Sequence, residues 1–511
     1  MDWHVGAGSP SRSGQWYSHS VRDRLSQIGP PALAGAIALL IAGGHSIATD
    51  ESFSWGVAAQ PSVIEYWDGL RFVSGNMGGY FTVLRGWLAF GDGLVWLRLP
   101  GILAFVLTVV AVMRTAERWF NRPIAVWAGV LTATSVPLLY FAVEIRSYAL
   151  VALATTLMWS ALERSLATDS LRHWLSLGFW AGVAVSAHLI MVLVTPILAL
   201  IVLARSGAGF FGSAIRLAPI GIFSLPTGVL LLLGDSADVD WILPLDIRSI
   251  VVAGRLLLGD HAQLTGEGSG PALMVLFLFI YLAAAVGIIR SAHRQIEDLY
   301  LWAWFLGLPS ILVLVSFVEP LILHRYLIGS LPAGLIIAAR WLHSLDRARV
   351  ATVIVIVLAV LGGVRSVALS PHSADLNGEL AAAIEARAQE GDALVVPIAW
   401  HRTGLEYQWR DGSPVEALAP FRADFDHSRL IERLDRGPSA SESDWIAPDT
   451  RVWVMIRSDS AQTFVEVERG DEEFNFFAAD QALRDTHTVA EEFDIQRFRV
   501  RLYEPLSGGA G

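Results

Sequence analysis

Asp50 and Glu51 are adjacent carboxylates placed where a long apolar stretch, residues 31–48, ends. A carboxylate at the end of a membrane-length apolar stretch is partly removed from water. Its pKa can therefore rise toward that of a useful general base. Two solvated acids in a loop would give the same pattern, so position alone leaves both interpretations open. The pair is the first candidate for proton-transfer chemistry, with Asp50 and Glu51 as candidate catalytic residues.

A second charged group, Glu144-Ile145-Arg146-Ser147-Tyr148, lies at the boundary between two further apolar stretches, residues 123–142 and 147–165. Charged side chains at membrane depth are rare and usually functional. A Glu–Arg pair that closes a helix turn would explain the same residues without any function. The sequence alone does not separate these two interpretations.

A third group consists of Glu319-Pro320 and His324-Arg325-Tyr326, at the start of the apolar stretch 321–340. The planar guanidinium of Arg suits an anionic phosphate. The chain contains no Lys, so a permanent side-chain cation at a phosphate must be Arg. The alternative is an interfacial Arg whose stem lies along the apolar surface beside a Tyr anchor.

Other candidate residues give weaker evidence of a function. His188 interrupts one long apolar run, and a lone His in such a setting is usually a hydrogen-bonded core residue. Asp238-Val239-Asp240 resembles a nucleotide-sugar metal motif, but three residues in a loop indicate a solvated segment. Cysteine is absent, and no P-loop or zinc-binding His motif occurs. The sequence thus predicts no metal ligands.

The elements that position these residues are predicted to span a membrane. The chain is 54% hydrophobic and only 17% charged, which excludes an ordinary soluble enzyme. A bilayer-spanning helix needs about 20 mostly apolar residues. That rule predicts eleven spans: 31–48, 96–116, 123–142, 147–165, 174–188, 190–205, 213–234, 271–290, 299–318, 321–340 and 349–367.

The positions of the Arg residues predict the orientation of these spans. With residues 1–30 as a cytoplasmic tail, 15 of the 23 Arg residues before residue 371 lie in the short inner segments. Cytoplasmic loops carry such an excess. An odd number of spans then places residues 371–511 outside the cytoplasm. That segment holds 27 acidic residues and 14 Arg, so its net charge is −13.

The outer segments are predicted to contain further structure. The first outer loop, 49–95, contains two stretches, 62–73 and 79–91, that we expect to lie at the membrane surface as helices. A similar stretch near 247–258 lies in the second loop, 235–270. Residues 371–511 are predicted to form an α/β domain, with helices at 376–389 and 426–436. Strands are predicted at 392–397, 451–456 and 495–503.

All the strong candidates fall on one face of the membrane, while the spans themselves are almost free of acids. A pump or channel would distribute polar groups along the depth of its spans. The pattern therefore favours a membrane enzyme that acts at the outer leaflet. The alternatives are a lipid or sugar transporter or flippase, and a non-catalytic membrane scaffold.

The layout resembles the GT-C membrane glycosyltransferases that use polyprenyl-phosphate sugars. The most similar groups are the protein O-mannosyltransferases, the aminoarabinose transferases and the RgtA/B/C/D-like proteins. The resemblance spans about residues 30–370 and is carried by four stretches: Asp50-Glu51, Phe90–Pro100, Glu144–Leu150, and His324–Leu327 with Pro332. Where the family often has a basic residue or His followed by Pro-Pro, this chain has Asn76-Met77-Gly78-Gly79-Tyr80.

The resemblance implies roles for these residues. Asp50 would be the general base, which removes a proton from an acceptor hydroxyl during one inverting attack. Arg325 and Arg146 would bind the phosphate of the departing lipid, whose growing negative charge needs a cation. Glu51 would help at the catalytic centre. The residues expected to support the acceptor or the site are Glu144, Tyr148, Tyr80, His324 and Tyr326.

The resemblance also implies the setting. The partners would be a polyprenyl-phosphate sugar, an envelope glycan, lipid or protein hydroxyl, and the bilayer, with no nucleic acid. The enzyme would be a hexosyl- or pentosyltransferase, similar to the mannosyltransferases, in the plasma (inner) membrane. The sequence leaves open whether a divalent cation takes part.

Overall fold

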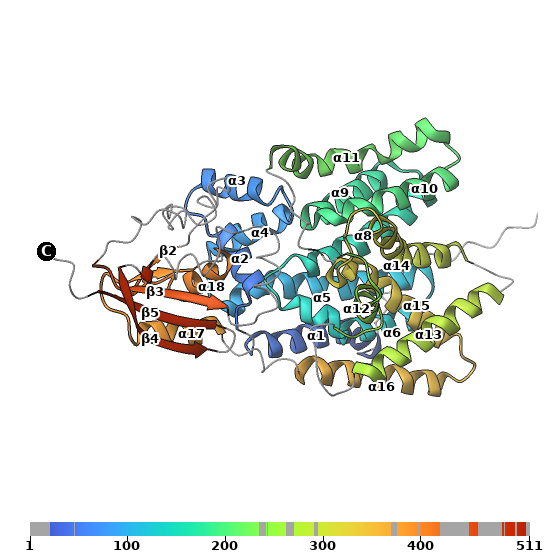
Figure 1. The fold of residues 1–511 in the computed structure, drawn as a ribbon. Coiled ribbons are helices and arrows are strands. Elements are labelled where there is room, and N and C mark those ends of the chain that lie inside the picture. Colours follow the sequence, from blue (N-terminus) through green and yellow to red (C-terminus); the bar gives the residue numbers. More distant parts are fainter. Residues whose placement is uncertain are drawn as a thin grey trace, which may run out of the picture.

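The computed structural model describes residues 21–44, 46–234, 242, 244–261, 270–290, 295–368, 376–396, 399–418, 449–457, 483–484, 486–495 and 498–506. Two bodies lie end to end: a bundle of long helices, and a smaller unit with a sheet formed by residues after 376 (Figure 1). Helices α2, α3 and α4 lie between them (Figure 1). The expected polytopic helical architecture with a C-terminal α/β domain is confirmed.

The bundle and its connecting segments are made of the following helices, where η denotes a 3₁₀ helix: α1 (Val21–Ala42), α2 (Thr49–Ala58), α3 (Val63–Phe72), α4 (Gly78–Leu88), α5 (Leu94–Trp119), α6 (Arg122–Ala133), α7 (Val136–Ala142), α8 (Tyr148–Thr168), α9 (Leu171–Ala187), η1 (Leu189–Val194), α10 (Thr195–Arg205), α11 (Gly209–Leu233), α12 (Ile247–Leu257), α13 (Gly270–Arg290), α14 (Ile296–Val315), η2 (His324–Ser330), α15 (Leu331–His343) and α16 (Ala348–Ala368).

Each of the eleven predicted spans corresponds to helical structure. Fewer than eleven helices of the described part, however, are long and apolar enough to cross a membrane by themselves. Among the described residues, six helices are long and apolar enough to cross a membrane, and a seventh span results if the bent pair α6 and α7 is counted as one. Of the other predicted spans, α9 is shorter and two are interrupted by 3₁₀ turns. Helix α8 has sufficient length, but it includes the charged residues Glu163 and Arg164. The chain is a multi-pass membrane protein, while the count of eleven spans stays a prediction.

The first span differs from its expected position. We expected residues 31–48, whereas α1 runs from Val21 to Ala42. Gly43 and Gly44 follow, and Gly is a poor helix former because its backbone loses much freedom on ordering. Asp50 therefore does not sit directly at the end of the span. It lies in the first turn of a separate short helix, α2, which the sequence pattern did not predict.

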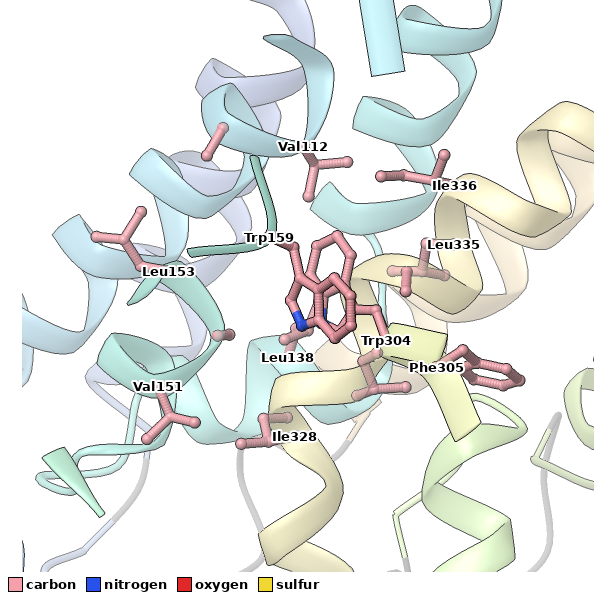
Figure 2. Packing of buried hydrophobic residues seen from close by; sticks show 14 of the residues in the cluster. Val112, Leu138, Val151, Leu153, Trp159, Trp304, Phe305, Ile328, Leu335 and Ile336 are labelled. Atoms are coloured by element: carbon pink, nitrogen blue, oxygen red, sulfur yellow. The ribbon is translucent and has the colours of Figure 1, made fainter. Parts of the chain in front are cut away.

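The centre of the bundle is closely packed. Figure 2 shows Trp159 of α8 beside Trp304 of α14, and the two rings stack with their centroids 6.0 Å apart. The Trp304 indole donates a hydrogen bond to the Gly329 carbonyl (2.7 Å). Gly178 and Gly182 of α9 lie against α11, where a Cβ atom on either glycine would collide with Pro219 or Phe223. Small residues at a spacing of four allow membrane helices to approach closely.

The three stretches that we expected to form surface helices are helical in the structure. Helix α3 occupies the predicted stretch 62–73, α4 the stretch 79–91, and α12 the stretch 247–258. Helix α3 begins with a capping box, in which the Ser62 hydroxyl accepts from the Glu65 backbone and the Glu65 carboxylate accepts from the Ser62 backbone. Val63 and Ile64 of α3 are exposed, as an interfacial helix requires.

The C-terminal unit contains α17 (Leu376–Glu385), α18 (Ala399–Gln408), β1 (Ala393–Val395), β2 (Glu416–Leu418), β3 (Val452–Arg457), β4 (His487–Ile495) and β5 (Phe498–Pro505). Strands β2, β1 and β3 are parallel, and the antiparallel strands β5 and β4 complete the order β2-β1-β3-β5-β4. The single strand expected over 495–503 is instead the end of β4 and most of β5. The helix expected at 426–436 lies outside the described residues.

Candidate active site

Asp50 lies in the first turn of α2 and is turned toward solvent. Its side chain is 54% exposed, and the helix dipole favours a negative charge at this position. The carboxylate Oδ2 is 3.1 Å from Nη1 of Arg325 and 4.0 Å from Nη2 of Arg146. Three residues that are far apart in the sequence thus meet at one point, as the sequence predicts.

Arg146 is also fixed to the backbone of α2. Its Nη1 donates to the Asp50 carbonyl (3.2 Å) and to the Ser54 hydroxyl (3.3 Å). Its guanidinium lies over the Tyr148 ring at 5.8 Å from the centroid. The cation is therefore held in place by contacts other than the Asp50 carboxylate.

The two arginines determine the ionisation of Asp50. Partial burial alone would raise the pKa of the carboxyl group, but the positive charges of Arg146 and Arg325 outweigh that effect and lower the pKa. Asp50 is consequently an anion at neutral pH, the form that can accept a proton.

Glu51 has a different environment, although it is the next residue. Its side chain is 4% exposed and forms an ion pair with Arg98 of α5, which is 1% exposed. The Glu51 carboxylate also accepts hydrogen bonds from the Ile145 and Ala48 backbone amides, each at 2.9 Å. The Arg98 guanidinium in turn donates to the Ala42 carbonyl (2.6 Å) and the Ser46 carbonyl (2.9 Å).

This Glu51–Arg98 pair joins α2, the end of α1 and the segment before α8. Its donors and acceptors are used within the protein, which is what a buried ion pair requires. From the sequence we expected Glu51 beside Asp50 at the catalytic centre, and we expected no role for Arg98. An Arg near the start of a strongly apolar stretch was the available signal, because such residues are rare in spans.

Glu144 lies in the short segment between α7 and α8, near the same end of the bundle. Burial, followed by the negative charges of Glu51 and Asp50, raises its pKa to about 8. Glu144 is therefore protonated at neutral pH while Asp50 is ionised. Tyr80 of α4 is buried next to these acids, and burial together with the Glu51 charge raises its pKa.

Two further expected site residues, Tyr148 and Tyr326, belong to an aromatic cluster near Arg146 and Arg325. Tyr148 stacks with His188 (centroids 6.0 Å apart), and His188 contacts Tyr326 edge-on (4.8 Å). His188 is buried and its Nδ1 accepts from the Ile190 amide, so the expectation of a hydrogen-bonded core histidine is confirmed. The His324 ring is instead packed against His261, at 5.2 Å.

Metal ligands do not gather in this part of the chain. Within the described ranges, no three His, Asp or Glu residues lie close enough together to hold an ion. The Asp238-Val239-Asp240 segment falls outside those ranges.

The family comparison matches part of the chain. Residues 77–226 match the model of the family described as dolichyl-phosphate-mannose-protein mannosyltransferase. This match begins after Asp50 and includes Glu144, Arg146 and Tyr148. No curated protein matches the chain significantly by sequence.

Solved structures match over nearly the whole chain. ArnT from Cupriavidus metallidurans bound to undecaprenyl phosphate is 14% identical, with a TM-score of 0.59 over 94% of this chain and 98% of that one. The chain has the GT-C glycosyltransferase fold. The Archaeoglobus fulgidus oligosaccharyltransferase in its apo form is 11% identical, with a TM-score of 0.52 over 86% of this chain and 70% of that one.

The archaeal oligosaccharyltransferase AglB from Archaeoglobus fulgidus, in complex with an inhibitory peptide and a dolichol-phosphate, matches with a TM-score of 0.50 at 11% identity over 92% of this chain and 73% of that one. At these identities the likeness establishes the GT-C fold. The likeness does not assign roles to individual residues of this chain, which follow from its own geometry.

Proposed function

We propose that the protein is an inverting glycosyltransferase that moves a sugar from a polyprenyl-phosphate donor to a hydroxyl group of an envelope acceptor, at the outer face of the membrane. The observation that carries this proposal is the meeting of the exposed Asp50 carboxylate with Arg325 and Arg146. The GT-C fold supports it, because two solved proteins with this fold are bound to undecaprenyl phosphate and to dolichol-phosphate.

In this mechanism Asp50 is the general base. Its Oδ2 accepts the proton of the acceptor hydroxyl as the oxygen attacks the anomeric carbon from the side opposite the phosphate. The bond between the anomeric carbon and the phosphate oxygen breaks in the same step, so the configuration inverts. The lowered pKa of Asp50 keeps it ionised and ready to accept the proton.

Arg325 and Arg146 act on the leaving group. When the bond breaks, negative charge grows on the lipid phosphate, and a guanidinium placed beforehand stabilises that charge without reorganising. Before the donor binds, Arg325 pairs with Asp50 at 3.1 Å. We propose that the donor phosphate takes over part of this pairing, which leaves the carboxylate free to accept the proton.

Glu51 is assigned a positioning role in place of the catalytic one expected from the sequence. Its carboxylate is buried and already accepts from Arg98, Ala48 and Ile145, so it has no surface to offer a substrate. Glu144, protonated at neutral pH, can donate a hydrogen bond at the same end of the bundle. Tyr80, Tyr148 and Tyr326 are proposed to line the acceptor side, and His324 to support η2.

The test is transfer by the purified protein in lipid nanodiscs. Radiolabelled polyprenyl-phosphate sugars, hexosyl and pentosyl, are offered with an envelope lipid and glycan extract, to the wild type and to Asp50→Asn. We expect the wild type to transfer one donor and Asp50→Asn to be slower by about 10²- to 10⁴-fold, the usual contribution of a general base. Parallel reactions with EDTA and with Mg²⁺ test a cation requirement, which the proposed steps do not include.

Transfer by both proteins at the same rate would remove Asp50 from its role. Failure of the folded wild type to bind or use any donor would contradict the glycosyltransferase proposal. Movement of the lipid-linked sugar between the leaflets of sealed proteoliposomes, without transfer, would favour the flippase alternative.

A further inference from the structure

Helix α2 presents three successive residues to three different neighbours. Successive residues of an α-helix point about 100° apart. Asp50 faces Arg325 of η2, and Glu51 faces Arg98 of α5. Ser52 faces Thr403 of α18, which belongs to the C-terminal unit. A rotation of α2 therefore cannot move one of these contacts without moving the other two.

The hydroxyl groups of Ser52 and Thr403 form a buried hydrogen bond of 3.0 Å, with side chains that are 0% and 2% exposed. Ser52 Oγ also donates its single proton to the Thr49 carbonyl (2.9 Å). Thr403 must then be the donor to Ser52, because a hydroxyl has only one proton to give. The C-terminal unit thus supplies a directed hydrogen bond to the residue two positions after Asp50.

The contact between α2 and α18 continues one turn further along both helices. Gly56 follows Ser52 by four residues, and a Cβ atom there would lie 3.3 Å from Thr403 Cγ2. Tyr407 follows Thr403 by four residues, and its ring contacts Trp55 edge-on at 5.4 Å. This spacing of four places the contact residues on one face of each helix. Tyr407 belongs to the apolar cluster around α2 and α4 and not to the core of its own sheet.

Two further contacts hold the segments on either side of α2. The Asn377 side-chain amide donates to the Ile47 carbonyl (3.0 Å), two residues before α2 begins. Asp92, just before α5, accepts from Arg410 at 3.1 Å, and its carbonyl accepts from the Tyr407 hydroxyl at 3.1 Å. The C-terminal unit therefore contacts the segment before α2, at Ile47, and the segment before α5, at Asp92.

We propose that Thr403 is a positioning residue for the Asp50 site, and that the C-terminal unit completes this site through α18. Its hydrogen bond to Ser52 fixes the rotation of α2, so that Asp50 faces Arg325 and Arg146 while Glu51 remains on Arg98. The inference rests on the proposed function for its effect on turnover. The part that concerns how α18 fixes the rotation of α2 does not depend on the proposed function.

The first experiment removes the hydroxyl in full-length protein in nanodiscs. Thr403→Val has nearly the same shape and leaves Ser52 still bonded to the Thr49 carbonyl. We expect kcat to fall about tenfold with an unchanged KM for the donor, since small misplacement of a catalytic group is costly. Thr403→Ser keeps the donor and should restore kcat. The control is Thr486→Val, whose hydroxyl bonds to His487 within the C-terminal unit and which should transfer at the wild-type rate.

A second experiment uses the absence of cysteine from the chain. The double variant Ser52→Cys/Thr403→Cys places two thiols where hydroxyl oxygens lie 3.0 Å apart, so a small side-chain shift would bring the sulfurs to the S–S bond length of about 2.05 Å. With an added thiol oxidant such as diamide, which accepts the two electrons and two protons, we expect the disulfide to form, detected as a mass loss of two hydrogens, and to keep transfer near the wild-type rate. Reduction should lower transfer several-fold, because a thiol pair replaces a strong hydrogen bond with a weak one. The reductant should not affect the wild type.

The two proposals fail in different ways. Equal kcat for the wild type and Thr403→Val, or a double variant that transfers as well reduced as oxidised, would overturn the positioning role and leave the glycosyltransferase intact. A wild type that uses no donor would contradict the proposed function. In that case the formation of the disulfide still tests whether α18 holds α2, and failure to form it would overturn the inference.

Discussion

The region around Asp50 and the region around Glu51 differ sharply, although they begin at adjacent residues. In both regions a carboxylate forms an ion pair with arginine. The Asp50 side chain is 54% exposed and meets two cations, whereas the Glu51 side chain is 4% exposed and meets one. The Asp50 carboxylate has oxygen surface left for a ligand, while the Glu51 carboxylate also accepts two backbone hydrogen bonds.

The difference shows why residue type does not determine role. A buried pair with all its partners inside the protein fixes a structure, and removing one member leaves a charge that cannot reach water. An exposed carboxylate between two cations can exchange partners with a substrate at much lower cost. Loss of stability and loss of turnover should therefore separate between the two regions.

The largest expected effect concerns the buried pair. Arg98→Leu leaves the Glu51 carboxylate buried without its cation, which should cost about 3–5 kcal/mol of unfolding free energy. We expect a clear drop in the thermal unfolding midpoint, followed by tryptophan fluorescence in nanodiscs. Asp50→Asn should leave that midpoint unchanged, because its carboxylate is already half in water.

The double variant Glu51→Gln/Arg98→Gln sharpens this test. It removes both charges and keeps polar groups at both positions, so it should be more stable than Arg98→Leu. If Arg98→Leu is as stable as the wild type and loses only turnover, the division between the two regions is wrong.

The next effect distinguishes the two cations of the Asp50 site. Arg325 lies closer to the carboxylate, at 3.1 Å against 4.0 Å for Arg146. Removing one preorganised donor to a developing anion typically costs about 10²- to 10³-fold in kcat. We expect Arg325→Gln to fall in that range in the nanodisc assay, and Arg146→Gln to lose less. Equal and unimpaired transfer by both variants would contradict their role at the phosphate.

Arg325→Gln should also alter the pH dependence. Arg146 and Arg325 hold the pKa of Asp50 below its usual value of 3.8, against the effect of burial. With Arg325 removed, one of the two positive charges that lower the pKa of Asp50 is lost, and the pKa should rise. The acidic limb of the kcat/KM profile should therefore move to higher pH in Arg325→Gln, and it should stay in place in the surface control Arg216→Gln.

The sequence predicted the meeting of Asp50, Arg146 and Arg325 but not the partner of Glu51. Hydropathy and the Arg bias predicted that the three residues lie on one face of the membrane, and the resemblance to the GT-C enzymes implied that they share one site. Arg98 lies within an apolar stretch, and only the path of the chain after Gly44 shows that it meets Glu51. Helix α2 was missed for a related reason, because its apolar residues pack on α4 and α18 and show no periodic face of their own.

The fold could be predicted more fully than the span count. Long apolar stretches such as α13 and α16 were located to within a few residues, since lipid demands length and apolarity together. The stretches 321–340 and 123–142 are apolar enough for a span, but the structure interrupts the first with a 3₁₀ helix and the second with a bend. The strand predicted over 495–503 corresponds mainly to β5, whereas its antiparallel partner β4 was not predicted apart from Ile495.

The smallest effect concerns Glu144, which titrates on the other side of neutrality from Asp50. Burial and the charges of Glu51 and Asp50 raise its pKa from 4.5 to about 8, so the folded protein holds this proton at pH values where the unfolded chain has lost it. Its contribution to stability is therefore fully present below pH 4.5. It decreases as the pH rises from 4.5 to about 8 and is absent above that range.

Glu144→Gln is neutral at every pH and should remove this dependence. Unfolding midpoints in nanodiscs, measured from pH 5 to pH 9, should fall less steeply in the variant than in the wild type. The two curves should diverge most above pH 8, where the wild type carries an additional buried charge beside Glu51 and Asp50. Parallel curves would show that Glu144 is ionised at neutral pH. Asp50 would then not be the single base at this end of the bundle, because two carboxylates could accept the proton.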